Sequence, residues 1–135
     1  MLTLQQIKKC SPVPINTTNI CYYGVYNNRY CEQDEKYTIE IHPDHKNDIL
    51  THLHEIKHAK DDKRNHKCYR NSTLKCRIIR EYRAILFELR YGLRYNLSEL
   101  VDLLKLINED SFNKTHQQAY KLIKKTKAYK KAMNL

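Results

Sequence analysis

Apolar positions follow two different spacings along the chain, and they predict strands before Pro43 and helices after it. Residues 20–26 and 36–42 are rich in tyrosine, valine, isoleucine and threonine, which suit a half-buried pleated sheet. Within the second segment apolar and polar residues alternate, as expected when one face of a strand is buried. The pair Asn27-Asn28 between the two segments is a candidate tight turn.

Helical periodicity occurs in four segments, which are residues 46–60, 73–91, 98–107 and 114–132. Ser72 and Ser98 are the candidate N-caps of the second and third helices. A short helix is also expected over residues 2–9, ended by the segment Ser11-Pro12-Val13-Pro14, because prolines favour extended backbone before them. Two strands and several helices indicate an α+β fold.

The helix expected over residues 98–107 has an apolar stripe at the spacing of one helix face. Its members are Leu97, Leu100, Val101, Leu104 and Ile107. We interpret this stripe as a packing face rather than a binding groove.

The chain has 135 residues with only two glycines, three prolines and no internal repeat, so one domain over residues 1–135 is expected. Within it we distinguish an N-terminal segment (1–19), a core (20–95) and a helical C-terminal portion (96–135). No apolar run approaches the roughly 18 residues of a bilayer span, and the first twenty residues lack the apolar stretch of a secretory signal. We therefore expect no membrane partner and a cytoplasmic location.

Positive charge is concentrated in the second half of the chain. Residues 1–58 contain six basic and seven acidic side chains, whereas residues 59–135 contain nineteen and eight, which gives −1 and +11 and sums to the net charge of +10. A basic surface can attract nucleic acid or an acidic protein, but cationic side chains on helices more often form a solvated face.

The five cysteines occur at irregular spacings without a C-x-x-C pair, which favours free thiols over a disulfide framework. They are Cys10, Cys21, Cys31, Cys68 and Cys76. His66, Cys68 and Cys76 could share a metal, but their spacing is not that of a structural zinc site.

The pattern H-E-x-x-H lies within the first predicted long helix. His54 and His58 are four residues apart, so both imidazoles lie on one helix face and can bind the same cation. Glu55 lies beside that face, within reach of a water on the metal. Solvated histidines on a polar helix face are the alternative interpretation.

The other positions of this helix have different expected roles. Ile49, Leu53 and Ile56 form an apolar stripe that faces the core and holds the helix rigid. His52 is about 200° around the helix from His54, so we expect it to be a surface or hydrogen-bonded histidine outside the site.

A catalytic zinc needs a third protein ligand and an open position. The metzincin class is excluded, because Asp61 and Arg64 stand where its glycine and third histidine would be. Glu81 and Glu88 are the candidates on the following helix. We choose Glu81, since the small Ala84 one turn away would allow close helix packing; Glu88 is the alternative, and either could instead be an exposed glutamate paired with an arginine.

The order of these features resembles the ImmA/IrrE family of small zinc metallopeptidases. The resemblance is carried by Gly24-Val25-Tyr26-Asn27-Asn28, a strand, the H-E-x-x-H helix and Glu81-x-x-Ala84, and it extends over roughly residues 24 to 125. It implies a zincin-like domain in which a short antiparallel sheet or hairpin packs on the active-site helix and the glutamate helix. Lys57 departs from the family pattern, which usually has an uncharged residue there.

The resemblance also implies a function. Zinc would be held by His54, His58 and Glu81, with Glu55 as the general base of peptide hydrolysis. The substrates implied are proteins, namely helix-turn-helix repressors of phages, mobile elements or stress regulons. A peptide could add as an extra strand beside residues 37–42, if that strand is the sheet edge next to the zinc.

Two further functions stay open. One is a SprT-like protease that acts on DNA-associated proteins and docks through its basic half. The other is a non-enzymatic nucleic-acid-binding module that contacts phosphates through lysines. The lysines concerned are Lys121, Lys124, Lys125, Lys127, Lys130 and Lys131.

Overall fold

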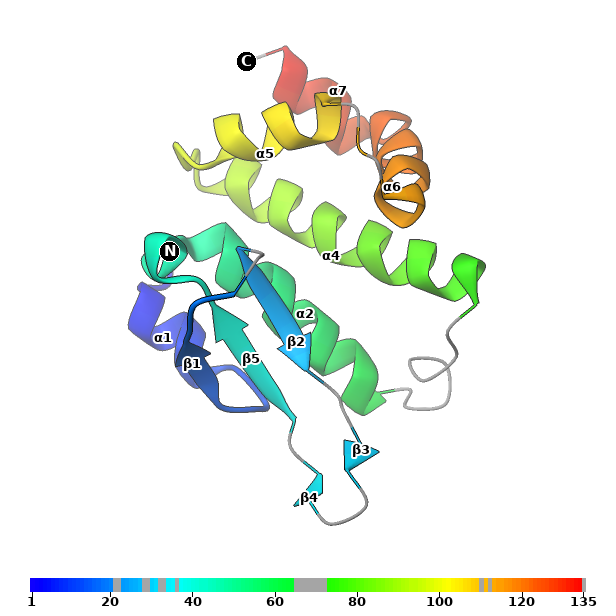
Figure 1. Cartoon of the computed structure of the whole chain (residues 1–135). Coiled ribbons are helices and arrows are strands. Elements are labelled where there is room, and N and C mark those ends of the chain that lie inside the picture. The colour runs from blue at the N-terminus through cyan, green and yellow to red at the C-terminus, as the bar shows by residue number, and fades with distance from the viewer. Residues whose placement is uncertain are drawn as a thin grey trace.

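The computed structural model describes residues 1–20, 23–27, 30–31, 34–35, 37–64, 73–109, 111 and 113–134. Within these ranges a small sheet packs on one long helix, a second long helix packs on the other side of the first, and three shorter helices cover the second (Figure 1). The elements are α1 (Leu4–Lys9), β1 (Ile15–Thr17), β2 (Gly24–Asn27), β3 (Tyr30–Cys31), β4 (Asp34–Glu35), β5 (Thr38–Ile41), the 3₁₀ helix η1 (Pro43–His45), α2 (Ile49–Arg64), α4 (Leu74–Arg94), α5 (Leu100–Asn108), α6 (Lys114–Lys124) and α7 (Lys127–Met133). The α+β prediction is confirmed.

The main sheet has the strand order β1-β5-β2, with β1 parallel and β2 antiparallel to β5. Its mixed pairing corrects the expectation of a purely antiparallel sheet or hairpin. The alternation predicted for residues 36–42 is confirmed, because Ile39 and Ile41 are fully buried while their neighbours are only half-buried. However, β5 is the central strand, so a peptide cannot add beside it; among the described strands β1 and β2 are the two edges of this sheet. Asn28 of the expected turn lies outside the described residues.

The helices differ from prediction mainly at their ends. Thr73, rather than Ser72, caps α4 by accepting a hydrogen bond from the Cys76 N–H; Ser72 lies outside the described residues. Ser98 does not cap α5, which has no side-chain cap. The single helix predicted over residues 114–132 is two helices, α6 and α7. The chain breaks at Thr126, which is the N-cap of α7 and whose hydroxyl oxygen accepts a hydrogen bond from the Tyr129 N–H.

A further correction concerns the apolar stripe of α5. Leu100, Leu103 and Ile107 are buried, whereas Val101 is 57% exposed and faces solvent. The inward face follows the spacing 100, 103, 107, so Leu103, which the predicted stripe omitted, is buried and Val101 is turned outward.

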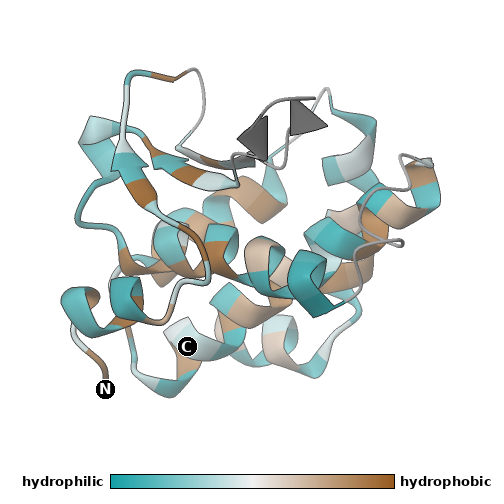
Figure 2. Cartoon of the chain, turned by 90° about the horizontal axis from the view of Figure 1, so that it is seen from below, coloured by the Kyte–Doolittle hydropathy of each residue, from teal (hydrophilic) through white to brown (hydrophobic). Residues whose placement is uncertain are grey.

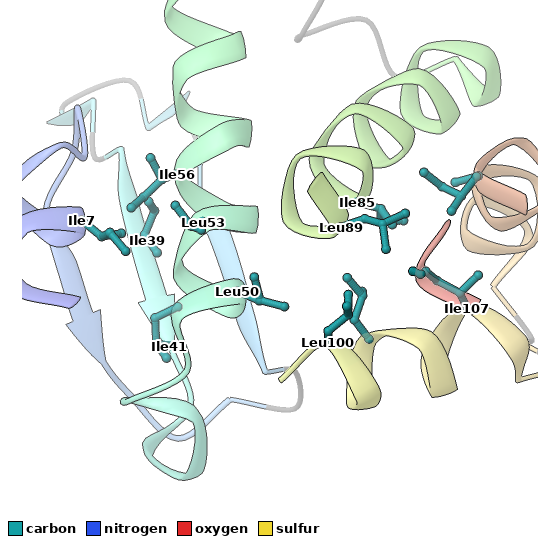
Figure 3. Close-up of a cluster of buried hydrophobic side chains, with 14 of the residues drawn as sticks. Ile7, Ile39, Ile41, Leu50, Leu53, Ile56, Ile85, Leu89, Leu100 and Ile107 are labelled. Carbon is teal, nitrogen blue, oxygen red and sulfur yellow. The ribbon is translucent and has the colours of Figure 1, made fainter. Parts of the chain in front are cut away.

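The buried hydrophobic side chains form one cluster that reaches from the sheet to the C-terminal helices (Figure 3). Its part between the sheet and α2 includes Ile39, Ile41 and Ile56, and its part beyond α2 includes Leu89 of α4 and Ile107 of α5. Hydrophilic and hydrophobic positions alternate along the helices (Figure 2), and none of the described helices is long and apolar enough to cross a membrane.

Candidate metal centre

The site lies where α2 and α4 pack against each other. Their directions are opposite, because Arg83 of α4 contacts Asp61 near the end of α2 while Glu88 contacts His54 in its middle. This arrangement brings Glu81 opposite the two histidines of the H-E-x-x-H pattern.

Three side chains meet within contact distance of one another. The Nε2 atoms of His54 and His58 are 3.1 Å apart. Glu81 places Oε1 3.0 Å from the Nε2 of His58 and Oε2 3.3 Å from the Nε2 of His54. Tetrahedral zinc with bonds of about 2.0 to 2.1 Å requires its ligand atoms to be roughly 3.3 Å apart. The three residues therefore have the donor types and the spacing of a zinc site.

Glu88 orients the first of these histidines. Its Oε2 is 2.7 Å from the Nδ1 of His54. An ionised carboxylate only accepts hydrogen bonds, so when Glu88 is ionised Nδ1–H is the donor and the Nε2 lone pair is directed at the three-residue cluster. Burial raises the pKa of Glu88. Glu88, the alternative ligand of the sequence analysis, thus lies on the opposite side of the His54 ring from the other donors.

Glu55 is buried beside the cluster, at 5% exposure, with its Oε1 3.8 Å from the Nε2 of His54. His54, Glu55 and His58 lie close enough together to hold a cation by themselves, and a Glu81 oxygen, at 3.3 Å, is closer to the Nε2 of His54 than Glu55 Oε1 is. Glu55 Oε2 is buried and has no hydrogen-bond partner among the described residues. A buried carboxylate oxygen in this state is costly unless a ligand supplies the missing donor.

The cluster favours positive charge. Burial alone lowers the pKa of His54, but the carboxylates of Glu88 and Glu81 outweigh this effect and hold the pKa well above its usual value. Burial alone raises the pKa of Glu81, but His54 and two further histidines hold it well below its usual value. The same field would attract a metal cation.

A cavity of about 650 Å³ opens onto the cluster. Its walls come from α2, α4, β2 and α6, and β2 approaches closely because residue 24 is glycine: a Cβ there would lie 3.0 Å from the Cγ of Glu55. The Tyr26 hydroxyl of β2 donates a hydrogen bond of 2.6 Å to Asp62 Oδ2 and ties this strand to the end of α2.

Sequence reasoning missed two cavity residues, His116 and Tyr120 of α6. The Nε2 of His116 is 3.5 Å from Glu81 Oε2. Burial, with nearby Glu81 and Glu88, raises the pKa of Tyr120. No local pattern marks these residues, because their place depends on how α6 packs across α4.

The other predicted residues lie apart from the cluster. His52 is 1% exposed, so it is no surface residue, and its ring Nδ1 is 2.7 Å from the Asp48 carbonyl oxygen. The Nζ of Lys57 is 3.1 Å from Oδ1 of Asp61. This ion pair holds the lysine charge away from the donor atoms of the cluster. Cys76 is a free thiol, whereas His66 and Cys68 of the alternative metal set lie outside the described residues.

The alternative interpretation of Glu81 and Glu88 was an exposed glutamate paired with a nearby arginine. Both carboxylates face histidines, and Arg83 instead pairs with Asp61 at 2.9 Å.

Comparison of the chain with models of known protein families, with curated proteins and with solved structures gives no match. The chemistry of the site therefore has to be argued from its own residues.

Proposed function

We propose that the protein is a zinc-dependent peptidase with a small zincin-like domain, and that His54, His58 and Glu81 hold its metal. One observation carries the proposal: two imidazole nitrogens and a carboxylate meet at 3.0 to 3.3 Å. The buried oxygen of Glu55 beside them supplies the acceptor that peptide hydrolysis requires. The resemblance to ImmA/IrrE peptidases supports the same assignment.

Zinc bound there would polarise a peptide carbonyl and lower the pKa of a water molecule toward about 7. Glu55 accepts the proton that the attacking water loses and passes it to the leaving amine. His116 and Tyr120, which also line the cavity, are candidate hydrogen-bond donors for the carbonyl oxygen as it gains negative charge.

The substrate is a segment of another protein in extended conformation. Among the described strands β2 is an edge strand, and it lines the cavity next to Glu55, so a peptide can add beside it and pass over the donor cluster. A helix-turn-helix repressor is the substrate that the family resemblance suggests.

The test combines metal analysis with cleavage of a candidate repressor. Protein purified without added zinc or chelator should contain about one zinc per chain, and His54→Ala should lose it. Glu55→Gln should keep the zinc and lower the cleavage rate by about 10² to 10⁴. Glu109→Gln, the same change at an exposed position, serves as the control and should cleave normally. Absence of zinc from the purified protein would refute the assignment.

A second candidate function is nucleic-acid binding, either alone or in a SprT-like protease. It is favoured by the C-terminal helices, because residues 111–135 include seven lysines and no acidic residue, and all seven lysines are exposed. Strongly salt-dependent DNA binding that chelators do not affect would support the non-enzymatic role. DNA-stimulated cleavage would support the SprT-like role.

A further inference from the structure

The first turn of α6 brings a third histidine, His116, to the metal donors. α6 packs on α4 (Figure 1), and its residues Ala119 and Ile123 are fully buried. His116 precedes these two residues by three and seven positions, so all three side chains share one face of the helix. The N-cap residue Asn113 accepts a hydrogen bond of 3.2 Å from the His116 N–H. Packing and capping thus fix the point from which this imidazole enters the cavity.

The His116 imidazole approaches the same oxygen of Glu81 that faces His54. Its Nε2 is 3.5 Å from Glu81 Oε2, and the Nε2 of His54 is 3.3 Å from that oxygen. Ordinary N–H···O hydrogen bonds are about 2.7 to 3.2 Å long, and Glu81 Oε2 is a buried atom with no hydrogen-bond partner among the described residues. Both separations are instead close to the roughly 3.3 Å expected between two ligand atoms of a tetrahedral zinc ion.

The fold encloses these side chains to different degrees. The three donors assigned above, His54, His58 and Glu81, are 7 to 20% exposed, whereas His116 is 38% exposed. A ligand that solvent reaches leaves a metal more readily than a buried ligand, because its departure disturbs little core packing. His116 is therefore the member of this set that a substrate can displace.

We propose that His116 is a fourth, displaceable ligand of the zinc ion and closes its open position until substrate binds. This inference rests on the proposed peptidase function, which supplies both the metal and the substrate. In the free protein three imidazoles and one carboxylate complete a tetrahedral site without a water ligand. An extended peptide that enters the cavity displaces the imidazole and opens the site. The alternative role of His116 is the one named above, a hydrogen-bond donor that never binds the metal.

The first test measures zinc affinity by competition with a chromophoric chelator. His116→Gln removes the imidazole but keeps an N–H donor. We expect it to lower the affinity by at least about 10-fold, because even groups that only orient ligands contribute about 10- to 100-fold. Lys114→Gln, at an exposed position of the same helical turn, is the control and should bind zinc as the wild type does. Equal affinities of wild type and His116→Gln would overturn the proposal.

The second test counts the imidazole ligands and needs no substitution, so it does not depend on how any variant folds. X-ray absorption at the zinc edge should show three imidazoles bound to zinc in the free wild-type chain. Acetohydroxamate, which binds zinc through two oxygen atoms, should reduce this number to two. Two imidazoles in the free chain would overturn the proposal.

Acetohydroxamate also measures the displacement itself. A site that is closed in nine of ten molecules binds an added ligand about 10-fold more weakly than an open one. Zinc-loaded His116→Gln should therefore bind acetohydroxamate about 10-fold more tightly than the zinc-loaded wild type, as measured by isothermal titration calorimetry. If His116 only donates a hydrogen bond, the variant should bind acetohydroxamate equally or more weakly, and that result would overturn the proposal.

None of these measurements uses cleavage, so this inference and the peptidase function fail separately. Three imidazoles on the zinc, with no cleavage of any peptide, would refute the peptidase function and leave His116 as a ligand. Cleavage by a chain with two imidazoles on its zinc would overturn this inference alone. A wild-type chain that binds no zinc would refute both.

Discussion

The interface between α2 and α4 has two ends of opposite character. At one end Leu50 of α2 and Leu100 of α5 pack against Gly92 of α4, where an added Cβ would lie 3.1 Å from Leu100 Cδ1. At the other end two imidazoles and three carboxylates meet, and two buried carboxylate oxygens there, Glu55 Oε2 and Glu81 Oε2, have no hydrogen-bond partner among the described residues. Burial of apolar groups stabilises the fold, whereas burial of unpaired polar groups destabilises it. The apolar end therefore maintains the helix pair and the polar end depends on a ligand, and the two should respond differently to change.

Truncation at the apolar end should have the largest effect on stability. Leu50→Ala removes a side chain that is 4% exposed, and we expect it to lower the free energy of unfolding by about 2 to 5 kcal/mol. Val101→Ala, at a 57% exposed position, should change it by less than about 0.5 kcal/mol. Urea unfolding measures both, and equal losses would contradict the burial described for these helices.

Zinc should stabilise the polar end. A free zinc concentration one hundred times the dissociation constant should raise the free energy of unfolding by about 2.7 kcal/mol, because only the folded chain brings the three ligands together. Thermal unfolding with zinc, with chelator and with magnesium measures this effect. Magnesium, which prefers oxygen ligands, should give little stabilisation. An unchanged melting temperature with zinc would show that the folded chain does not bind it preferentially.

Removal of the negative charge from the hydrogen bond that orients His54 should weaken metal binding without abolishing it. Glu88→Gln should lower zinc affinity by about 10- to 100-fold, which is roughly 1.4 to 2.7 kcal/mol. Competition with a chromophoric chelator gives the affinity, and Glu109→Gln is the matched control. If Glu88→Gln instead abolished zinc binding as completely as His54→Ala, Glu88 would be a ligand rather than an orienting group.

The smallest effect is expected at the ion pair that flanks the site. Burial alone raises the pKa of Asp61, but hydrogen bonds from Arg83 and Lys57 outweigh it and hold the pKa below its usual value. A lowered pKa in the folded state stabilises the protein above the unfolded pKa of about 3.9, and this contribution is lost as the pH falls through the folded value. Arg83→Ala should therefore destabilise the chain by at most about 1 kcal/mol near pH 7, since Arg83 is 44% exposed, and by less below pH 4. A constant difference at both pH values in urea unfolding would contradict this assignment.

The elements whose signals are local could be predicted from the sequence. Regular apolar periodicity located α4, and the alternation in β5 identified Ile39 and Ile41 as inward-facing. Strand pairing could not be obtained in this way, because β1 and β2 flank β5 through contacts between distant segments. Val101 was misplaced for a related reason: this helix has apolar residues at both 101 and 103, and its packing against α4 and α6 decides that Leu103 faces inward.

The candidate site likewise combines features that a local sequence pattern predicts with features that depend on distant segments. The spacing of His54 and His58 within one helix was sufficient to suggest a common ligand, and Ala84, which is fully buried, correctly indicated close helix packing near Glu81. The positions of His116 and Arg77 in the cavity depend on how several helices meet, and no spacing within one segment indicates them.

The most direct test of the central claim is a crystal structure of the zinc-loaded chain with anomalous diffraction recorded at the zinc edge. We predict one anomalous peak per chain, at bonding distances of about 2.0 to 2.1 Å from the Nε2 atoms of His54 and His58 and about 2.0 to 2.2 Å from an oxygen of Glu81. A zinc ion bound elsewhere, or no peak between these three residues, would contradict the account.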